Sequence, residues 1–158
     1  MTRLMVPVPL RWADLDAYGH VNNVDVLRLL EEARIAAFWR HPEETGASWP
    51  TAVLDAGPGA ATHTLVASTE IEYLVPLGYH RDPVTVEMWI GQIGGASIDV
   101  CYQLTALADG ERVVYVQART TLVLIASQTG RPRRVTPEER AVWQEYVEPM
   151  VRMRRRAT

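Results

Sequence analysis

The residues best suited to chemistry gather in one short stretch, RWADLDAYGHVNN, at positions 11–23. The stretch holds two carboxylates, Asp14 and Asp16, the imidazole of His20, and two carboxamides at its end. A carboxylate beside a reacting carbonyl serves as nucleophile or as general base toward water. The stretch also ends where a helix is predicted to begin, and the unpaired amides of a first helical turn stabilise a developing oxyanion. Together these features predict acyl transfer or hydrolysis.

The same stretch also suits a purely structural role. Asp14 and Asp16 are of a type common in Asx-turns, and Asn22 or Asn23 is a good N-cap for the helix that follows. On local composition alone, a capped loop is slightly favoured over a catalytic one. The choice between the two interpretations therefore depends on the rest of the chain.

The elements next to this stretch are predicted from the spacing of apolar residues. Residues 6–12 contain two prolines and are predicted as an edge strand. From Asn23 to about Trp39 the pattern is helical, and His41–Pro42 is predicted to end the helix. One wide apolar face of this helix carries Val26, Leu29, Leu30, Ala33 and Ala37.

Four stretches farther along the chain alternate apolar and polar residues with period two, which is typical of half-buried strands. They cover residues 69–73, 84–90, 98–105 and 113–125. Gly94–Gly95 and Asp109–Gly110 lie between them and suit tight hairpins, so the strands are predicted to form an antiparallel meander. A short helix is predicted over 137–147, with Thr136 as its N-cap.

This order of elements predicts an α+β fold, in which one long central helix is wrapped by a curved antiparallel β-sheet. The length of 158 residues and the 47% content of hydrophobic residues suit a single domain over residues 1–158, including a short C-terminal helix and a basic tail from about residue 136. The open edges of such a sheet favour pairing with a second copy, so we expect a symmetric dimer. The basic tail is predicted to be solvated or to end a helix, and it contains Arg152, Arg154, Arg155 and Arg156.

The motif residues resemble a known family. DLDAYGHVNN at 14–23, running into LLEEAR at 29–34, resembles the signature of hotdog-fold acyl-CoA thioesterases, which include 4-hydroxybenzoyl-CoA thioesterase-like enzymes and acyl-ACP thioesterases. Residues 71–77 and 82–86 resemble the strand, loop and strand that follow in that family. The resemblance covers residues 6–126 in element order. It implies a hotdog fold, hydrolysis of an acyl-CoA to a free acid and coenzyme A, and a site at the interface of a homodimer or a dimer-of-dimers tetramer.

The resemblance also assigns catalytic roles within the motif. Asp16 matches the catalytic carboxylate, which attacks the thioester directly or activates a water molecule. His20 then orients the water or the substrate carbonyl, and the backbone amide near Asn23 polarises that carbonyl. No metal and no other cofactor is expected, because the helix amides supply the polarisation that a metal would otherwise provide.

Four further residues are assigned to substrate binding, and they are Tyr18, Gly19, Asn22 and Arg81. The two asparagine side chains of the motif suit a helix cap and a substrate contact equally well. Arg81 suits the phosphates of coenzyme A or a solvated surface, as do Arg131, Arg133 and Arg134. At Val26 the family often has an aromatic residue, so the smaller side chain is expected to reshape the acyl pocket.

Other reactive side chains are predicted to be structural. Glu31 and Glu32 are predicted to form ion pairs with Arg28 and Arg34 rather than to act as a second catalytic carboxylate. Cys101 lies in a strand pattern and is predicted to pack rather than to react. The histidines outside the motif lack metal-ligand spacing, so no metal site is predicted.

Bulk properties narrow the class of partner. A net charge of −3 provides no general attraction for nucleic acid, and no segment reaches the roughly 18–20 apolar residues that span a bilayer. We therefore expect a cytoplasmic protein without a nucleic-acid or membrane partner. Two other functions stay open: a non-catalytic acyl-CoA or acyl-carrier binding module, and a hotdog dehydratase or isomerase that acts on acyl thioesters.

Overall fold

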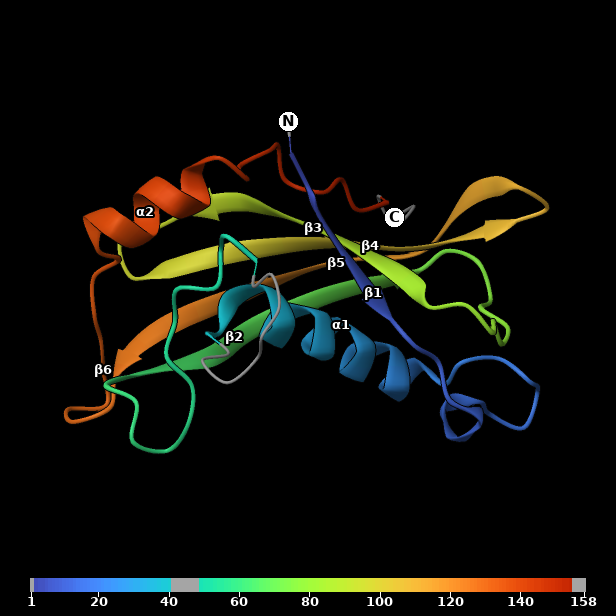
Figure 1. Ribbon diagram of the computed structural model, residues 1–158, viewed down its shortest axis with the longest axis horizontal. Coiled ribbons are helices and arrows are strands. Elements are labelled where there is room, and N and C mark those ends of the chain that lie inside the picture. Colours follow the sequence, from blue (N-terminus) through green and yellow to red (C-terminus); the bar gives the residue numbers. More distant parts are fainter. Residues whose placement is uncertain (1, 41–48, 155–158) are drawn as a thin grey trace.

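The computed structural model describes residues 2–40 and 49–154 and has the predicted α+β hotdog architecture (Figure 1). His41–Pro42, predicted to end the first helix, lies outside the described residues, and so do Arg155 and Arg156 of the basic tail. In chain order the elements are β1 (Leu4–Val8), the 3-10 turn η1 (Trp12–Asp14), α1 (Asn23–Phe38), β2 (Thr62–Tyr73), β3 (Val84–Ile93), β4 (Ser97–Ala108), β5 (Glu111–Ala126), β6 (Arg131–Pro132) and α2 (Pro137–Gln144).

The strands form one antiparallel sheet in the order β1-β3-β4-β5-β2, and the short β6 pairs with the end of β5. The consecutive pairing of β3, β4 and β5 confirms the predicted meander. α1 lies lengthwise against one face of this curved sheet (Figure 1). Its N-terminus is therefore at the same end of the molecule as η1 and the loop between β2 and β3.

The two residue pairs predicted to form tight hairpins differ in backbone conformation. Asp109 and Gly110 have φ angles of 52° and 79°, the left-handed conformation that a tight two-residue turn requires. Gly94 and Gly95 lie in the turn between β3 and β4, but neither has a positive φ. The hairpin there is closed instead by a hydrogen bond from the Gly94 amide to the Ser97 carbonyl at 2.8 Å.

Several predicted boundaries were wrong. β2 starts at Thr62 rather than at 69. The first strand covers Leu4–Val8 rather than 6–12, because Pro9 lacks the amide needed to continue pairing and the chain then turns into η1. The closing helix ends at Gln144 rather than at 147. Beyond it, the Tyr146 carbonyl accepts a hydrogen bond from the amide of Ile90 in β3 at 2.9 Å, so the chain leaves the helix to pair with the sheet.

The predicted ion pairs of α1 are present, but one arginine has a second role. Arg28 contacts Glu32 at 3.2 Å and Arg34 contacts Glu31 at 3.8 Å. Arg34 is nevertheless only 8% exposed, and its guanidinium donates a hydrogen bond to the hydroxyl of the buried Tyr102 at 3.1 Å. A charged side chain with that much burial requires such a partner, so Arg34 belongs to the interior as well as to the surface.

The chain after α2 packs on the face of the sheet opposite α1. Val151 contacts Trp89 and Cys101, which alternate along their strands with residues of the main core. Cys101 is fully buried, and burial raises the pKa of its thiol, which agrees with the predicted packing role.

None of the helices among the described residues has the length and apolar character of a membrane span. Two arginines of the basic tail are described and both are exposed, Arg152 and Arg154.

Candidate active site

The motif loop folds back on itself between η1 and α1. The Asp16 amide donates to the His20 carbonyl at 2.7 Å, and the Gly19 amide donates to the Asp16 carbonyl at 3.2 Å. Gly19 has a φ of 78°, a conformation that residues with a Cβ atom rarely adopt, so glycine is required at this turn. The result is a compact loop in which Asp16 and His20 lie side by side.

The Asp16 carboxylate takes part in the loop and still has a free oxygen. Its Oδ1 accepts hydrogen bonds from the amides of Tyr18 at 2.8 Å and His20 at 3.1 Å. The Asx-turn considered from the sequence is therefore present. The other oxygen, Oδ2, has no hydrogen-bond partner among residues 2–40 and 49–154. One carboxylate thus holds its own loop while presenting a second oxygen for chemistry.

Three backbone contacts fix the loop to its surroundings. His20 forms a β-bridge with Gly78, and the Val21 amide donates to the Leu77 carbonyl at 2.7 Å. The Asn22 amide donates to the Asp14 carbonyl at 2.8 Å. Because the β2–β3 loop and η1 both hold the motif loop, its position relative to α1 is well determined.

The first turn of α1 has one amide that a side chain caps, while the amide of its first residue has no partner in the described residues. Asn22 is the N-cap, and its Oδ1 accepts a hydrogen bond from the Val24 amide at 2.9 Å. Asn22 therefore caps the helix. A contact between Asn22 and the substrate stays a prediction. Within the described residues, the Asn23 amide has no acceptor. It is the kind of unsatisfied first-turn donor that can receive an oxyanion.

Tyr73, at the end of β2, holds the first residue of α1 from the other side. Its hydroxyl donates to the Asn23 carbonyl at 3.0 Å. Burial raises the pKa of the Tyr73 hydroxyl, so it stays protonated at neutral pH and remains a donor. The helix start is therefore fixed by the sheet as well as by its own cap.

All three predicted catalytic residues line one cavity of about 260 Å³. The predicted Asp16, His20 and Asn23 share its wall with Val26, whose position the family resemblance had linked to pocket shape. The sequence did not single out the other lining residues, because apolar side chains in a strand or loop carry no signal of their own. These are Val21, Tyr73, Val75, Pro76, Leu77 and Val116.

The four predicted substrate-binding residues do not line this cavity. Tyr18 is 85% exposed on the outside of the motif loop, and Gly19 forms the loop's turn. Asn22 serves as the cap, and Arg81 is exposed in the loop before β3. The wall of the cavity therefore contains the three predicted catalytic residues and none of these four.

Asp14, the first carboxylate of the motif, is a buried anchor rather than a turn residue. Its side chain is fully buried and binds two guanidinium groups, that of Arg11 at 2.9 Å and that of Arg28 at 2.8 Å. Burial alone raises the pKa of the Asp14 carboxyl, but hydrogen bonds from Arg11 and Arg28 outweigh it and hold the pKa below the ordinary value. Asp14 therefore ties η1 to α1 and, through its carbonyl, to Asn22.

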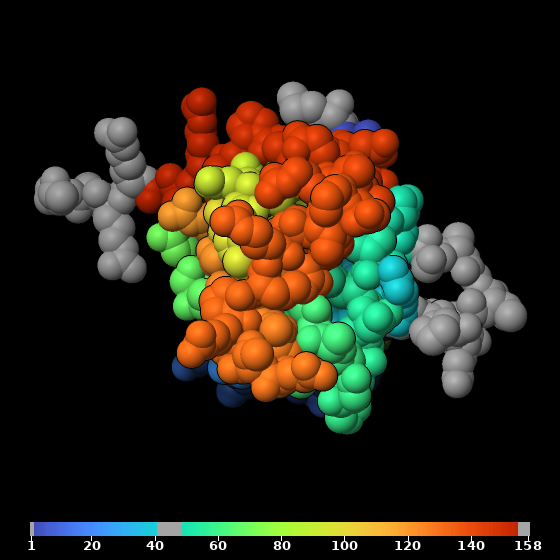
Figure 2. Space-filling view, turned by 90° about the vertical axis from the view of Figure 1, so that its left-hand side faces the viewer, coloured from blue at the N-terminus to red at the C-terminus, as the bar shows by residue number. Residues whose placement is uncertain are grey.

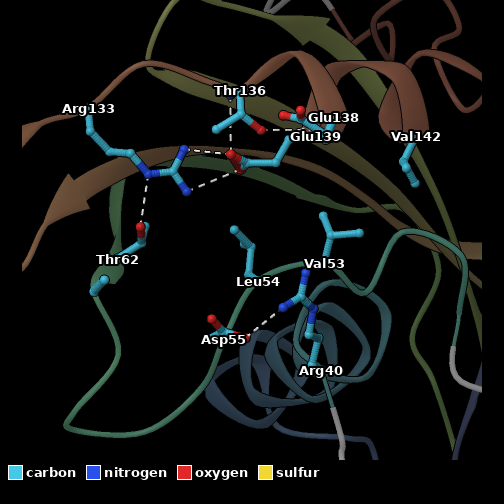
Figure 3. A pocket seen from close by; sticks show the side chains of 11 residues that line it. Arg40, Val53, Leu54, Asp55, Thr62, Arg133, Thr136, Glu138, Glu139 and Val142 are labelled. Atoms are coloured by element: carbon cyan, nitrogen blue, oxygen red, sulfur yellow. Dashed lines mark hydrogen bonds and ion pairs between the residues drawn. The ribbon is translucent and has the colours of Figure 1, made fainter.

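A second cavity, of about 280 Å³, lies at the opposite end of α1, beside α2 (Figure 3). Figure 2 views this end of the molecule, where α2 and the chain before it (orange) lie beside the segment around residues 49–65 (cyan to green). Both arginines in its wall are already paired, Arg133 with Glu139 at 2.6 Å and Arg40 with Asp55 at 3.0 Å. Its wall is dominated by these two ion pairs, whereas the wall of the first cavity holds the Asp16 carboxylate and the His20 imidazole.

Metal ligands do not gather in the described part of the chain. Among residues 2–40 and 49–154, no group of three or more His, Cys, Asp or Glu side chains is placed to hold a metal ion. The expectation that no cofactor takes part stays a prediction.

Comparison with known proteins identifies relatives of this arrangement. Residues 10–144 match the family described as the thioesterase-like superfamily. The PA2801 protein of Pseudomonas aeruginosa is 30% identical, with a TM-score of 0.69, and the match covers 89% of this chain and 98% of that one. A thioesterase from Thermus thermophilus, complexed with coenzyme A and Zn, is 29% identical with a TM-score of 0.64, and the match covers 90% and 92%. YbaW of Escherichia coli is 28% identical with a TM-score of 0.62, and the match covers 93% of this chain and 98% of that one. No curated protein matches the sequence.

Proposed function

The chain belongs to the thioesterase-like superfamily and is a thioester hydrolase, and from this premise we propose that its substrate is an acyl-CoA, cleaved at the motif loop. Water adds to the thioester carbonyl, the bond from carbon to sulfur breaks, and a carboxylic acid and the thiol of coenzyme A leave. The single observation that supports this site best is the cavity wall that Asp16, His20 and Asn23 share.

Each residue has a role that its contacts allow. Asp16 presents Oδ2 to the cavity as general base or nucleophile, while Oδ1 is held by the amides of Tyr18 and His20. The Asn23 amide, at the positive end of the α1 dipole, receives the oxyanion. His20, next to Asp16 in the loop, orients the attacking water or the carbonyl. The nonpolar remainder of the wall suits the acyl group.

Coenzyme A as the carrier is supported by a relative and by the chemistry of the surface. The Thermus thermophilus thioesterase was found in complex with coenzyme A. In this chain, exposed arginines such as Arg81 suit phosphate groups. An acyl-carrier protein stays the alternative carrier, and a dehydratase or a binding module the alternative functions.

Thiol release from a panel of acyl-CoAs tests the function. We expect turnover of at least one short, long or aromatic acyl-CoA by the purified protein, with stoichiometric free acid and coenzyme A. An enoyl product without free thiol would indicate a dehydratase. Binding without any turnover, by protein shown to be folded, would indicate a binding module. Both outcomes would contradict the proposed function.

We also propose a homodimer that pairs the free edge of β2. β2 pairs only with β5 among the described strands, so the outer edge of this twelve-residue strand has unpaired backbone groups. Apolar side chains are exposed on β2 itself, Leu65 at 56% and Val66 at 51%. Val24 of α1 is 68% exposed and follows Asn23, whose carbonyl accepts a hydrogen bond from Tyr73 of β2. A two-fold pairing of β2 with β2 satisfies the backbone and covers these side chains, next to the start of α1.

Sedimentation velocity tests the dimer. Wild type is expected at twice the chain mass of 17.7 kDa, or at four times that mass if two dimers associate. Val66→Glu is expected to shift the protein to the monomer mass, because it places a charge in the proposed contact. Leu107→Glu, which changes an exposed apolar residue next to the β4–β5 hairpin, serves as the control and is expected to leave the mass unchanged. Monomeric wild type would contradict the proposal.

A further inference from the structure

An exposed aromatic pair lies on the surface beside the motif loop. Trp12 of η1 stacks on Tyr79 of the β2–β3 loop, with ring centroids 4.4 Å apart and ring planes 12° from parallel. The Trp12 side chain is nevertheless 72% exposed. One face of the indole packs against Tyr79, so most of the remaining surface of this large ring is open to solvent. Large exposed aromatic rings beside a site are a common feature of ligand-binding surfaces.

The pair is joined directly to the proposed catalytic site. Tyr79 follows Gly78, which forms the β-bridge with His20, and Leu77, which lines the cavity. Trp12 lies in the same 3-10 turn as Asp14, whose carbonyl holds the Asn22 amide. The stack is therefore tied to the motif loop from two sides, through η1 and through the β2–β3 loop.

Two guanidinium groups flank the stack in the sequence. Arg81 follows Tyr79 by two residues, is exposed, and has no hydrogen-bond partner in the described part of the chain. Arg11 precedes Trp12 and is 59% exposed at its side chain, although it is also bound to Asp14. The acidic Asp82 lies next to Arg81, so the surface is not uniformly positive. An aromatic face beside arginines is complementary to a phosphorylated nucleoside.

We propose that Trp12, supported by Tyr79, binds the adenine ring of coenzyme A, and that Arg81 binds a phosphate of the same nucleotide. This assignment rests on the proposed function and adds the residues that recognise the nucleotide part of coenzyme A. Nucleobases stack on aromatic side chains whatever their sequence, and arginine is well suited to phosphate. A carrier protein presents phosphopantetheine without adenine, so a base-stacking surface favours coenzyme A.

The test compares two substrates that share the reacting thioester. The preferred acyl-CoA of wild type is assayed beside the same acyl group on pantetheine, which lacks the nucleotide. Trp12→Ala is expected to lower kcat/KM for the acyl-CoA by about tenfold, mainly by raising KM, as expected for the loss of one base-stacking contact. It is expected to leave kcat/KM for acyl-pantetheine unchanged. Trp12→Phe, which keeps an aromatic face, is expected to recover most of the loss.

Further variants separate the nucleotide contact from general damage. Arg81→Gln is expected to raise KM for the acyl-CoA several-fold and to weaken its dependence on salt. Leu107→Ala, which removes an exposed apolar side chain elsewhere, is the control and is expected to change neither substrate. Adenosine 3′,5′-bisphosphate is expected to inhibit wild type competitively against acyl-CoA and to inhibit Trp12→Ala about tenfold less strongly.

The possible failures are distinguishable. Wild type that hydrolyses acyl-CoA and acyl-pantetheine with equal kcat/KM would overturn the nucleotide site and leave the proposed hydrolysis intact. An equal loss for both substrates in Trp12→Ala would also overturn it, because it would mean that the change damages the motif loop. A higher kcat/KM for the same acyl group on a carrier protein than on coenzyme A would point to the other carrier. If Trp12→Ala also lowers that kcat/KM, the stack would be a contact for the carrier protein instead. Wild type without activity on any thioester would contradict the proposed function itself.

Discussion

Replacing Asp16 by asparagine is expected to lower kcat by about a hundredfold or more, because the general-base or nucleophilic carboxylate is lost. The variant is nearly the same size as wild type, and its Oδ1 can still accept from the amides of Tyr18 and His20. The loop should therefore persist, and KM should change little. Thiol release with the preferred acyl-CoA measures the effect, and circular dichroism verifies the fold.

A control variant at the other end of α1 shows whether the loss is specific to Asp16. Asp55→Asn, in the charged cavity at the other end of α1, is the matched control and is expected to retain wild-type kcat. Unchanged turnover in Asp16→Asn would mean that the chemistry takes place elsewhere.

A single turnover in H₂¹⁸O separates the two possible roles of Asp16, general base and nucleophile. Direct attack by water places the label in the product acid, whereas an anhydride opened at the Asp16 carbonyl leaves the label on Asp16.

Replacing Asp14 by alanine is expected to lower the free energy of unfolding by about 3 kcal/mol. The change removes a fully buried carboxylate and leaves the guanidinium groups of Arg11 and Arg28 without their shared partner. The loss should lie at the lower end of the range for buried pairs, because both arginines are partly exposed and can turn toward water. Urea unfolding at neutral pH measures it, and Asp55→Ala, which removes an exposed pair, is expected to cost less than about 1 kcal/mol.

The same comparison has a predicted pH dependence. The folded pKa of Asp14 is lowered from the ordinary 3.8, so its contribution to stability is fully present above that value. As the pH falls below 3.8 and through the lowered folded pKa, the carboxylate is protonated and the contribution is lost. The difference in unfolding free energy between wild type and Asp14→Ala should therefore shrink between neutral pH and strongly acidic pH. A difference that stays constant would show that Asp14 stabilises the fold by packing alone.

Much of the candidate site was predictable because its parts are close in sequence. Asp16, His20 and Asn23 lie within eight consecutive residues, so a loop followed by a helix was enough to bring them together. The choice between turn and catalysis was not predictable in the same way. The structure has the Asx-turn at Asp16, and it also leaves Oδ2 without a partner in the described residues, so the two interpretations turn out to be compatible.

The sequence by itself determined the elements and the motif. Period-two alternation indicated the meander, helical spacing indicated the buried face of α1, and the Asp109–Gly110 pair indicated a hairpin, since each depends on neighbouring residues. Only the tertiary structure decided that Asp14 is buried against Arg28, that Arg34 reaches the hydroxyl of Tyr102, and that Trp12 stacks on Tyr79. These partners are separated by between 14 and 68 residues. Their contacts follow from the pairing register and curvature of the sheet and from how the loops pack, and local periodicity does not encode any of these.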